Sequence, residues 1–339
     1  MKKRVCFGEA LYPLTFYLLF STKEQIDKTI FVVDRRIDKK IYSRLPNVVY
    51  DDLDSFFKKN SFLKCFWSLF IRPIKYKFLF EAEIFGLDFK WEYLRGLKMS
   101  YIEDAPNIFN IWETGMMYEN YIKHTSKNRF LLYLDKLLFG QYHNTPVATS
   151  KLVTDYYVCA PTSEKKYLEG KKEHILNWQD LWKESSESKK EFILNLFNIS
   201  PDDIVTLQKK KVLLLTQAFY EDNMCTEKEQ IDIYSSILNR YDTDQVLIKP
   251  HPRDRIEYKC FFPAVTTFDK VVPLQFLALL GIKFDTVVTV SSSAALCFGY
   301  KDVKIDWIGG DVHPGIIKAE GKRTLEMAIK QYKQQYGEK

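Results

Sequence analysis

Short apolar runs that alternate with amphipathic or polar stretches dominate the first half of this chain. Four of the runs have the length of buried strands and end on polar or acidic residues: Val5–Ala10, Ile30–Asp34, Asn47–Asp52 and Met99–Asp104. Helical spacing of apolar residues fills the gaps, for example at Phe16–Gln25 and Ile37–Arg44. Strands that alternate with helices are typical of a parallel sheet with helices on both faces, so we predict an α/β fold.

Residues 183–210 interrupt this pattern with a stretch rich in Lys, Glu, Ser and Asp, after which the alternation restarts. The second half predicts strands at Lys211–Phe219, Gln245–Pro250, Thr286–Val290 and Val303–Ile308, and helices at Glu227–Arg240, Leu274–Leu280 and Thr324–Tyr336. We therefore predict two Rossmann-like domains, residues 1–185 and 205–322, followed by a closing helix at 323–339. Ligands of such sheets bind beyond the carboxyl ends of the strands.

The composition is that of a globular protein. Hydrophobic residues make up 46% of the 339 positions, which excludes disorder as the main state. The six cysteines include no CxxC pair, which argues against a zinc ribbon or a disulfide framework and fits a reducing compartment. The basic start Met1–Arg4 is followed by Glu9 and Pro13 rather than by a signal-peptide core, and no run approaches the roughly 18 apolar residues of a membrane span. We expect a cytoplasmic location.

Three predicted strands end in residues with complementary chemistry. Met99–Ile102 leads into Glu103 and Asp104, and a carboxylate there can act as a general base if burial raises its pKa. Gln245–Lys249 leads into His251, which is held between two prolines and can present its imidazole to an anion. Thr286–Val290 leads into Ser291–Ser293, whose hydroxyl and amide groups before a helix form a phosphate site. Each motif alone also has a simpler interpretation. Ser291–Ser293 fits a helix N-cap, Glu103-Asp104 fits a solvated turn, and His251 fits a structural histidine.

In this order, the motifs Tyr101–Ala105, Lys249–Pro252 and Ser291–Ser293 resemble those of bacterial sialyltransferases, and most closely glycosyltransferase family 52. The resemblance implies a GT-B-like fold in which two Rossmann-like domains face each other across a cleft. It also implies transfer of sialic acid from CMP-sialic acid to a galactose of a lipooligosaccharide or capsule glycan, with inversion and without an obligatory metal or other cofactor. The N-terminal domain would then hold the acceptor, and the C-terminal domain the CMP-sugar.

The resemblance also implies roles for individual residues. Asp104 is the expected base and Glu103 an acceptor-side residue, while His251 is the expected acid or phosphate partner. The expected donor-binding residues are Lys249, Pro252, Thr216, Gln217, Ser291, Ser292 and Ser293. One departure concerns Ala105, which stands where the family has Gly and therefore changes the backbone freedom of the acid loop. For that reason Glu221 and Asp222, which follow the strand Lys211–Phe219, remain an alternative base.

Other acidic and histidine motifs favour structural roles. Asp242-Thr243-Asp244 has the DxD pattern of metal-dependent transferases, but it precedes a strand instead of following one, so we interpret it as a loop. Asp51-Asp52-Leu53-Asp54 fits the cap of a following helix. His313-Pro314 has no basic strand before it, which favours a structural role. We interpret His124, His143 and His174 as surface residues.

Phe56–Phe80 carries nine aromatic and six basic side chains and no acidic one. This composition fits peripheral contact with an anionic membrane, and it also fits a packed core with lysines that extend to solvent. The other open alternatives are a transferase with a glucosyl or glycerol-phosphate donor, and a catalytically inactive glycan-binding or nucleic-acid-binding protein. The net charge of +6 allows nucleic-acid binding, but 39 Lys against 11 Arg and interspersed acids argue against it. A homodimer remains an open expectation.

Overall fold

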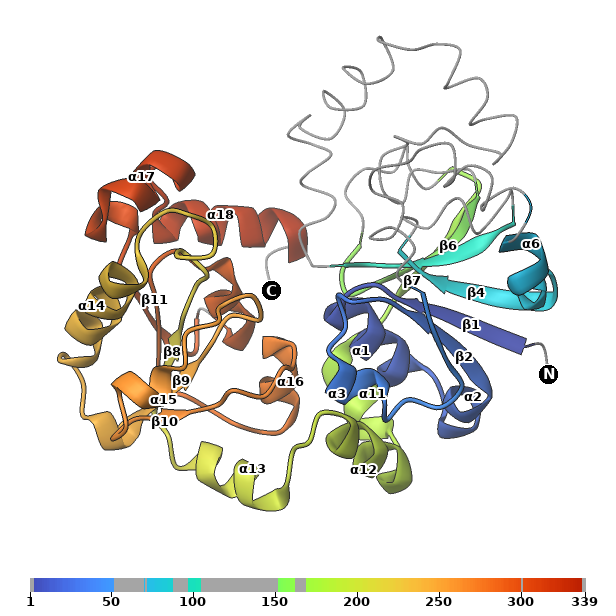
Figure 1. The fold of residues 1–339 in the computed structure, drawn as a ribbon, viewed down its shortest axis with the longest axis horizontal. Helices are drawn as coiled ribbons and strands as arrows, with labels where there is room; N and C mark the ends of the chain where they lie inside the picture. Colours follow the sequence, from blue (N-terminus) through green and yellow to red (C-terminus); the bar gives the residue numbers. More distant parts are fainter. Residues whose placement is uncertain are drawn as a thin grey trace, which may run out of the picture. The chain divides into compact units, whose positions relative to one another are not determined.

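The computed structural model describes residues 3–51, 70, 72–87, 97–104, 152–161, 169–299 and 301–336. The chain divides into two compact units, Met1–Leu196 and Phe197–Lys339. Each unit is built on its own parallel sheet (Figure 1).

Seven parallel strands form the sheet of the N-terminal unit within the described residues, in the order β3-β2-β1-β4-β5-β6-β7. Their bounds are Lys3–Gly8 (β1), Thr29–Val33 (β2), Val48–Tyr50 (β3), Ala82–Gly86 (β4), Met99–Ile102 (β5), Val153–Val158 (β6) and Lys172–Ile175 (β7). The central strand β1 pairs with β2 on one side and β4 on the other, and its residues Val5–Phe7 are buried. Apolar runs of this kind form central strands because both faces of a parallel sheet are covered.

The described helices of this unit are α1 (Leu11–Phe20), α2 (Lys23–Lys28), α3 (Lys39–Tyr42), α6 (Arg72–Lys75), the 3₁₀ turn η2 (Lys77–Glu81), α11 (Trp178–Glu184) and α12 (Glu187–Leu196). The sequence predicts one helix at Phe16–Gln25, but the structure has two. Thr22 explains the break, because it accepts a hydrogen bond from the Gln25 amide and begins α2 with a capping box.

The C-terminal unit contains a five-stranded parallel sheet of order β10-β9-β8-β11-β12. The strands are Val212–Leu215 (β8), Val246–Lys249 (β9), Thr266–Thr267 (β10), Thr286–Thr289 (β11) and Lys304–Trp307 (β12). The helices are α13 (Pro201–Gln208), α14 (Glu227–Leu238), α15 (Tyr258–Phe261), α16 (Leu274–Leu279), α17 (Pro314–Glu320) and α18 (Leu325–Tyr336), with 3₁₀ turns at Thr243–Gln245 (η5), Ser293–Phe298 (η6) and Gly310–Val312 (η7). Because β8, β9 and β11 are neighbours, the residues that follow them meet at one edge of the sheet.

Candidate functional site

His251 follows β9 and is fixed by its own backbone and ring. Its amide donates to Thr216 Oγ1 over 3.1 Å, which ties the loop after β9 to the end of β8. Its Nδ1 accepts from the Arg253 amide over 3.2 Å, so the neutral ring carries its proton on Nε2. Burial lowers the pKa of His251, and nearby Arg253 lowers it further. The ring is therefore neutral at pH 7 and presents Nε2–H as a hydrogen-bond donor.

Ser291 follows β11 and is locked to Gln217, which follows β8. The Ser291 amide donates to Gln217 Oε1 and Gln217 Nε2 donates to Ser291 Oγ, each over 2.9 Å. Ser291 is only 1% exposed, and its hydroxyl donates to Glu320 Oε2 over 2.7 Å. Ser292 and Ser293, which are partly exposed, are the members of the triplet that remain accessible to a ligand.

A cavity of about 150 Å³ brings these strand ends together. His251 and Ser291–Ser293 line it, as do Gln217, Ala218, Phe219, Asp222, Arg253, Glu320 and Arg323. The structure therefore brings the His-Pro motif and the Ser motif together at one cavity of this unit.

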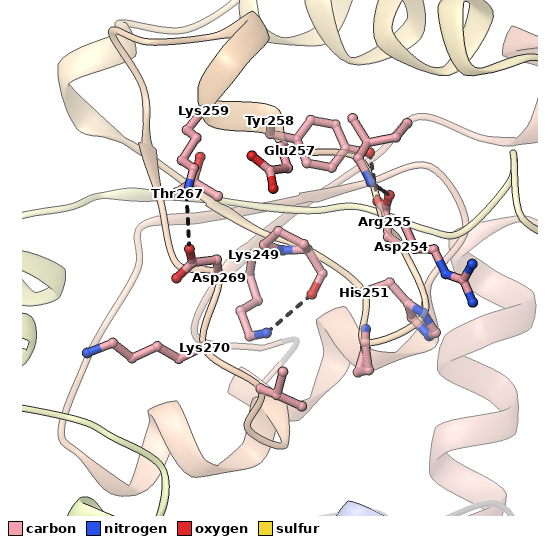
Figure 2. A pocket seen from close by; sticks show the side chains of 14 residues that line it. Lys249, His251, Asp254, Arg255, Glu257, Tyr258, Lys259, Thr267, Asp269 and Lys270 are labelled. Atoms are coloured by element: carbon pink, nitrogen blue, oxygen red, sulfur yellow. Dashed lines mark hydrogen bonds and ion pairs between the residues drawn. The ribbon is translucent and has the colours of Figure 1, made fainter. Parts of the chain in front are cut away.

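A second cavity of about 200 Å³ shares His251 with the first, and Figure 2 shows its lining. Lys249, Pro252, Asp254, Lys259, Asp269 and Lys270 are among its residues. Lys249 is 6% exposed, and its Nζ donates to Pro250 O over 3.2 Å, as the dashed line in Figure 2 marks. Burial lowers the pKa of Lys249 to about 8.

Asp254 is a partly buried residue that holds the loop after β9 in place, and the sequence analysis did not select it. It accepts hydrogen bonds from Thr216 Oγ1 over 2.6 Å and from the Tyr258 hydroxyl over 2.7 Å. Burial raises the pKa of Asp254. Through Thr216, this carboxyl group fixes the loop that carries His251.

Asp222, the alternative base, forms a two-bond ion pair with Arg253. Arg253 Nη1 lies 2.5 Å from Asp222 Oδ1, and Nη2 lies 2.9 Å from Oδ2. This pair lowers the pKa of Asp222. Its neighbour Glu221 accepts from the Arg255 amide over 2.8 Å. A carboxylate whose pKa is lowered by an arginine is a weak proton acceptor.

Glu103 and Asp104 follow β5 in the N-terminal unit and differ in environment. Glu103 is 3% exposed, and the Tyr12 hydroxyl donates to its Oε1 over 2.8 Å. Asp104 is only partly buried. Burial raises the pKa of both carboxyl groups, and the positive charge of Arg36 opposes the rise at Asp104.

Arg36 is held at the same sheet edge by two buried acids that the sequence analysis did not select. Its Nη2 lies 2.6 Å from Asp34 Oδ2 and 3.0 Å from Glu9 Oε1. Asp34 directly follows β2 and Glu9 directly follows β1. The criterion that selected Glu103, a polar residue at the end of a strand, therefore applies to them as well. The cluster fixes a cation near Asp104 and thereby limits how far burial can raise the pKa of that group.

The remaining motifs have structural roles in the described residues. Asp242 accepts from the Asp244 amide over 3.1 Å and caps η5, as the loop interpretation predicts. His313 Nδ1 accepts from the Gly315 amide over 3.1 Å and caps α17. His174 packs flat against Tyr157 and lies 2.9 Å from Asp155. Residues 52–54, His124 and His143 lie outside the described residues.

Most of the aromatic and basic stretch 56–80 also lies outside the described residues, which include Phe70 and residues 72–80 of it. In that part Phe70, Ile74 and Phe80 are 58%, 74% and 56% exposed. None of the helices in the described part of the chain combines the length and hydropathy needed to cross a bilayer.

Bacterial sialyltransferases are among the solved structures that have a similar fold. The GT-B domain of a sialyltransferase from Photobacterium damselae gives a TM-score of 0.54 at 12% identity, with 90% of each chain covered. An α/β-galactoside α-2,3-sialyltransferase from Photobacterium phosphoreum gives 0.51 at 13% identity, covering 89% of this chain and 90% of the other. The 2,6-sialyltransferase of Photobacterium sp. JT-ISH-224 gives 0.54 at 11% identity, covering 89% and 71%. The class of fold is therefore GT-B, as predicted.

Sequence comparison gives the family. Residues 96–309 match glycosyltransferase family 52. A Haemophilus influenzae relative, described as an uncharacterized protein, is 30% identical over 317 residues, which are 92% of this chain and 96% of the relative. The chain belongs to glycosyltransferase family 52, which confirms the family that the three motifs indicate and makes glycosyl transfer from a nucleotide sugar to a glycan its class of reaction.

Proposed function

We propose that this protein is an inverting sialyltransferase that moves sialic acid from CMP-sialic acid to a terminal galactose of a surface glycan. The observation that carries the proposal is the cavity shared by His251 and the Ser291–Ser293 loop in a chain of family 52. The structural relatives named above are sialyltransferases, and one was solved with CMP and lactose, which favours the same donor and acceptor class here.

In the proposed reaction a galactose hydroxyl oxygen attacks the anomeric carbon of sialic acid as the bond from that carbon to the phosphate oxygen of CMP breaks. His251 donates Nε2–H to the leaving phosphate, and Ser292 and Ser293 add hydrogen bonds. Donors aimed at developing charge in a partly buried site stabilise the transition state more than they would in water. The Ser291 hydroxyl donates its hydrogen bond to Glu320, so Ser291 positions this loop through its bonds with Gln217.

Asp104 takes the proton of the attacking hydroxyl in this proposal. Its raised pKa makes it a stronger proton acceptor than an exposed aspartate, whereas the pair with Arg253 has the opposite effect on Asp222. Glu103 is buried and accepts a hydrogen bond from Tyr12. Its proposed role is to position the loop that carries Asp104 on the acceptor side of the reaction.

The test is direct. Purified protein is incubated with CMP-sialic acid and a lactoside, and both released CMP and sialylated lactoside are measured. We expect both products in equal amounts. We also expect the rate to be unchanged in EDTA, because the proposed site uses hydrogen-bond donors where other transferases use a divalent metal ion. Turnover of a UDP- or CDP-activated donor, with no CMP released from CMP-sialic acid, would contradict the proposed donor.

Lys249 makes the affinity for CMP depend on pH. We propose that its ammonium group contacts the nucleotide from the second cavity, and its pKa of about 8 means that the free protein loses this charge in mildly alkaline solution. The dissociation constant of CMP should therefore rise up to about tenfold per pH unit above pH 8. Titration calorimetry at pH 7, 8 and 9 measures it. Lys249→Met should bind more weakly at pH 7 and show no such rise; a parallel rise in this variant would refute the assignment.

The exposed apolar side chains of Phe70, Ile74 and Phe80 favour an additional proposal, peripheral contact with the anionic inner face of the plasma membrane. The neighbouring Lys75 and Lys77 are exposed as well. Basic and large apolar side chains at one surface are typical of interfacial binding to acidic lipids.

A further inference from the structure

A carboxylate lines the cavity that we assign to the phosphate. Glu320 ends α17, and its Oε2 accepts the Ser291 hydroxyl proton over 2.7 Å. Its side chain is 18% exposed. Phosphate sites are usually lined by hydrogen-bond donors and cations, so an acidic side chain in this place calls for an explanation.

The charges that line this cavity cancel. Two arginines supply the positive charge, but Arg253 is paired with Asp222, and Arg323 Nη1 lies 3.9 Å from Glu320 Oε2. His251 is neutral at pH 7 because burial lowers its pKa. With two cations against two anions among the lining residues, the cavity has no surplus positive charge for a highly charged ligand, although the chain as a whole carries +6.

The Glu320 carboxylate therefore repels each negative charge that a ligand brings close to Ser291. A donor with one phosphate can take the hydrogen bonds of His251, Ser292 and Ser293 and place its single phosphate charge near Arg253. A nucleoside diphosphate adds at least one further charge within the same cavity of about 150 Å³, where Glu320 repels it. The hydrogen bond from Ser291 fixes the carboxylate in this position.

We propose that Glu320 is a specificity-determining residue that restricts the donor to sugars carried on a nucleoside monophosphate and selects against nucleoside diphosphates. This inference rests on the proposed function, because it requires that the cavity receive the phosphate of the donor.

The test compares CMP with CDP, which share base and ribose and differ by one phosphate. Titration calorimetry gives both dissociation constants for the wild type, Glu320→Gln, Glu320→Asp and Glu326→Gln. The Gln variant keeps an acceptor for the Ser291 hydroxyl and removes only the charge, and Asp keeps the charge. Glu326 lies on α18, does not line the cavity and loses the same charge, so its variant is the matched control.

We expect the wild type to bind CMP about tenfold or more tightly than CDP, and Glu320→Gln to reduce this ratio by about tenfold through tighter binding of CDP. Glu320→Asp and Glu326→Gln should keep the wild-type ratio. A Glu320→Gln ratio equal to that of the wild type, or a wild type without preference, overturns the inference while the proposed function stands. A wild type that binds neither nucleotide overturns both.

Discussion

Replacing Asp104 by Asn should lower kcat about 10²–10⁴-fold, the range expected when a positioned general base is removed. The amide has nearly the shape of the carboxyl group but cannot accept a proton, so the acceptor should still bind. CMP affinity should stay within about twofold because Asp104 faces the acceptor in the proposed reaction. Initial rates of CMP release with CMP-sialic acid and a lactoside give kcat, and calorimetry gives the affinity.

The pH dependence of kcat provides a second readout for Asp104. The base must be ionised, and burial raises its pKa above the ordinary range of an aspartate. Activity should therefore be full on the alkaline side and fall as the pH drops through this raised pKa. Removal of Arg36, whose charge opposes the rise, should move the acidic limb of the profile to higher pH. Arg36→Gln tests this shift.

Asp222→Asn is the matched control, because Asp222 is the alternative base and has a lowered pKa. Its variant breaks the pair with Arg253 and should change the KM for the donor more than kcat. An Asp104→Asn enzyme that turns over normally, beside an inactive Asp222→Asn enzyme, would place the base in the C-terminal unit. The role of base that the family resemblance implies for Asp104 would then be wrong for this chain, which has Ala105 where the family has Gly.

The sequence predicts the strands that consist of continuous apolar residues, and also the mixed strand β12 within Val303–Ile308, but it misses β4, β6, β7 and β10. Val5–Phe7, Leu213–Leu215 and Val246–Ile248 read as strands because both faces of a parallel sheet are covered. The edge strand β7, Lys172–Ile175, is absent from the sequence analysis because it contains a Lys, a Glu and a His and has no buried residue. The predicted strand Lys211–Phe219 ends in the structure at Leu215, where the chain turns to form the site.

The candidate site is predicted as far as it follows strands, and no further. His251 and Ser291–Ser293 could be found because sheet topology brings the carboxyl ends of β9 and β11 to one edge. Glu320 enters the same cavity from the end of α17, and Arg323 enters it from the segment between α17 and α18. Neither residue follows a strand, and no local pattern marks them. The sequence also cannot tell which serine gives its proton to a protein carboxylate, since that depends on the Ser291–Glu320 contact.

Replacing His251 by Ala should lower kcat about 10²–10⁴-fold, because the leaving phosphate loses its Nε2–H donor. The neutral ring at pH 7 and the acceptor role of Nδ1 toward the Arg253 amide leave Nε2–H as the group that faces the ligand. A partial loss of CMP affinity, by about tenfold, should accompany the loss in rate because a hydrogen bond to a charged group is removed. The CMP-release assay and calorimetry measure the two effects separately.

The chain offers its own control in a second His-Pro pair. His313 caps α17 through Nδ1 and is absent from the lining of the cavity, so His313→Ala should cost about 1 kcal/mol of folding free energy and leave kcat unchanged. His251→Ala should show the opposite pattern, a large loss in kcat with a small change in melting temperature. If His251→Ala retained full activity while His313→Ala lost it, the leaving group would not lie beside the Ser291–Ser293 loop, and the proposal of sialyl transfer at this cavity would fall.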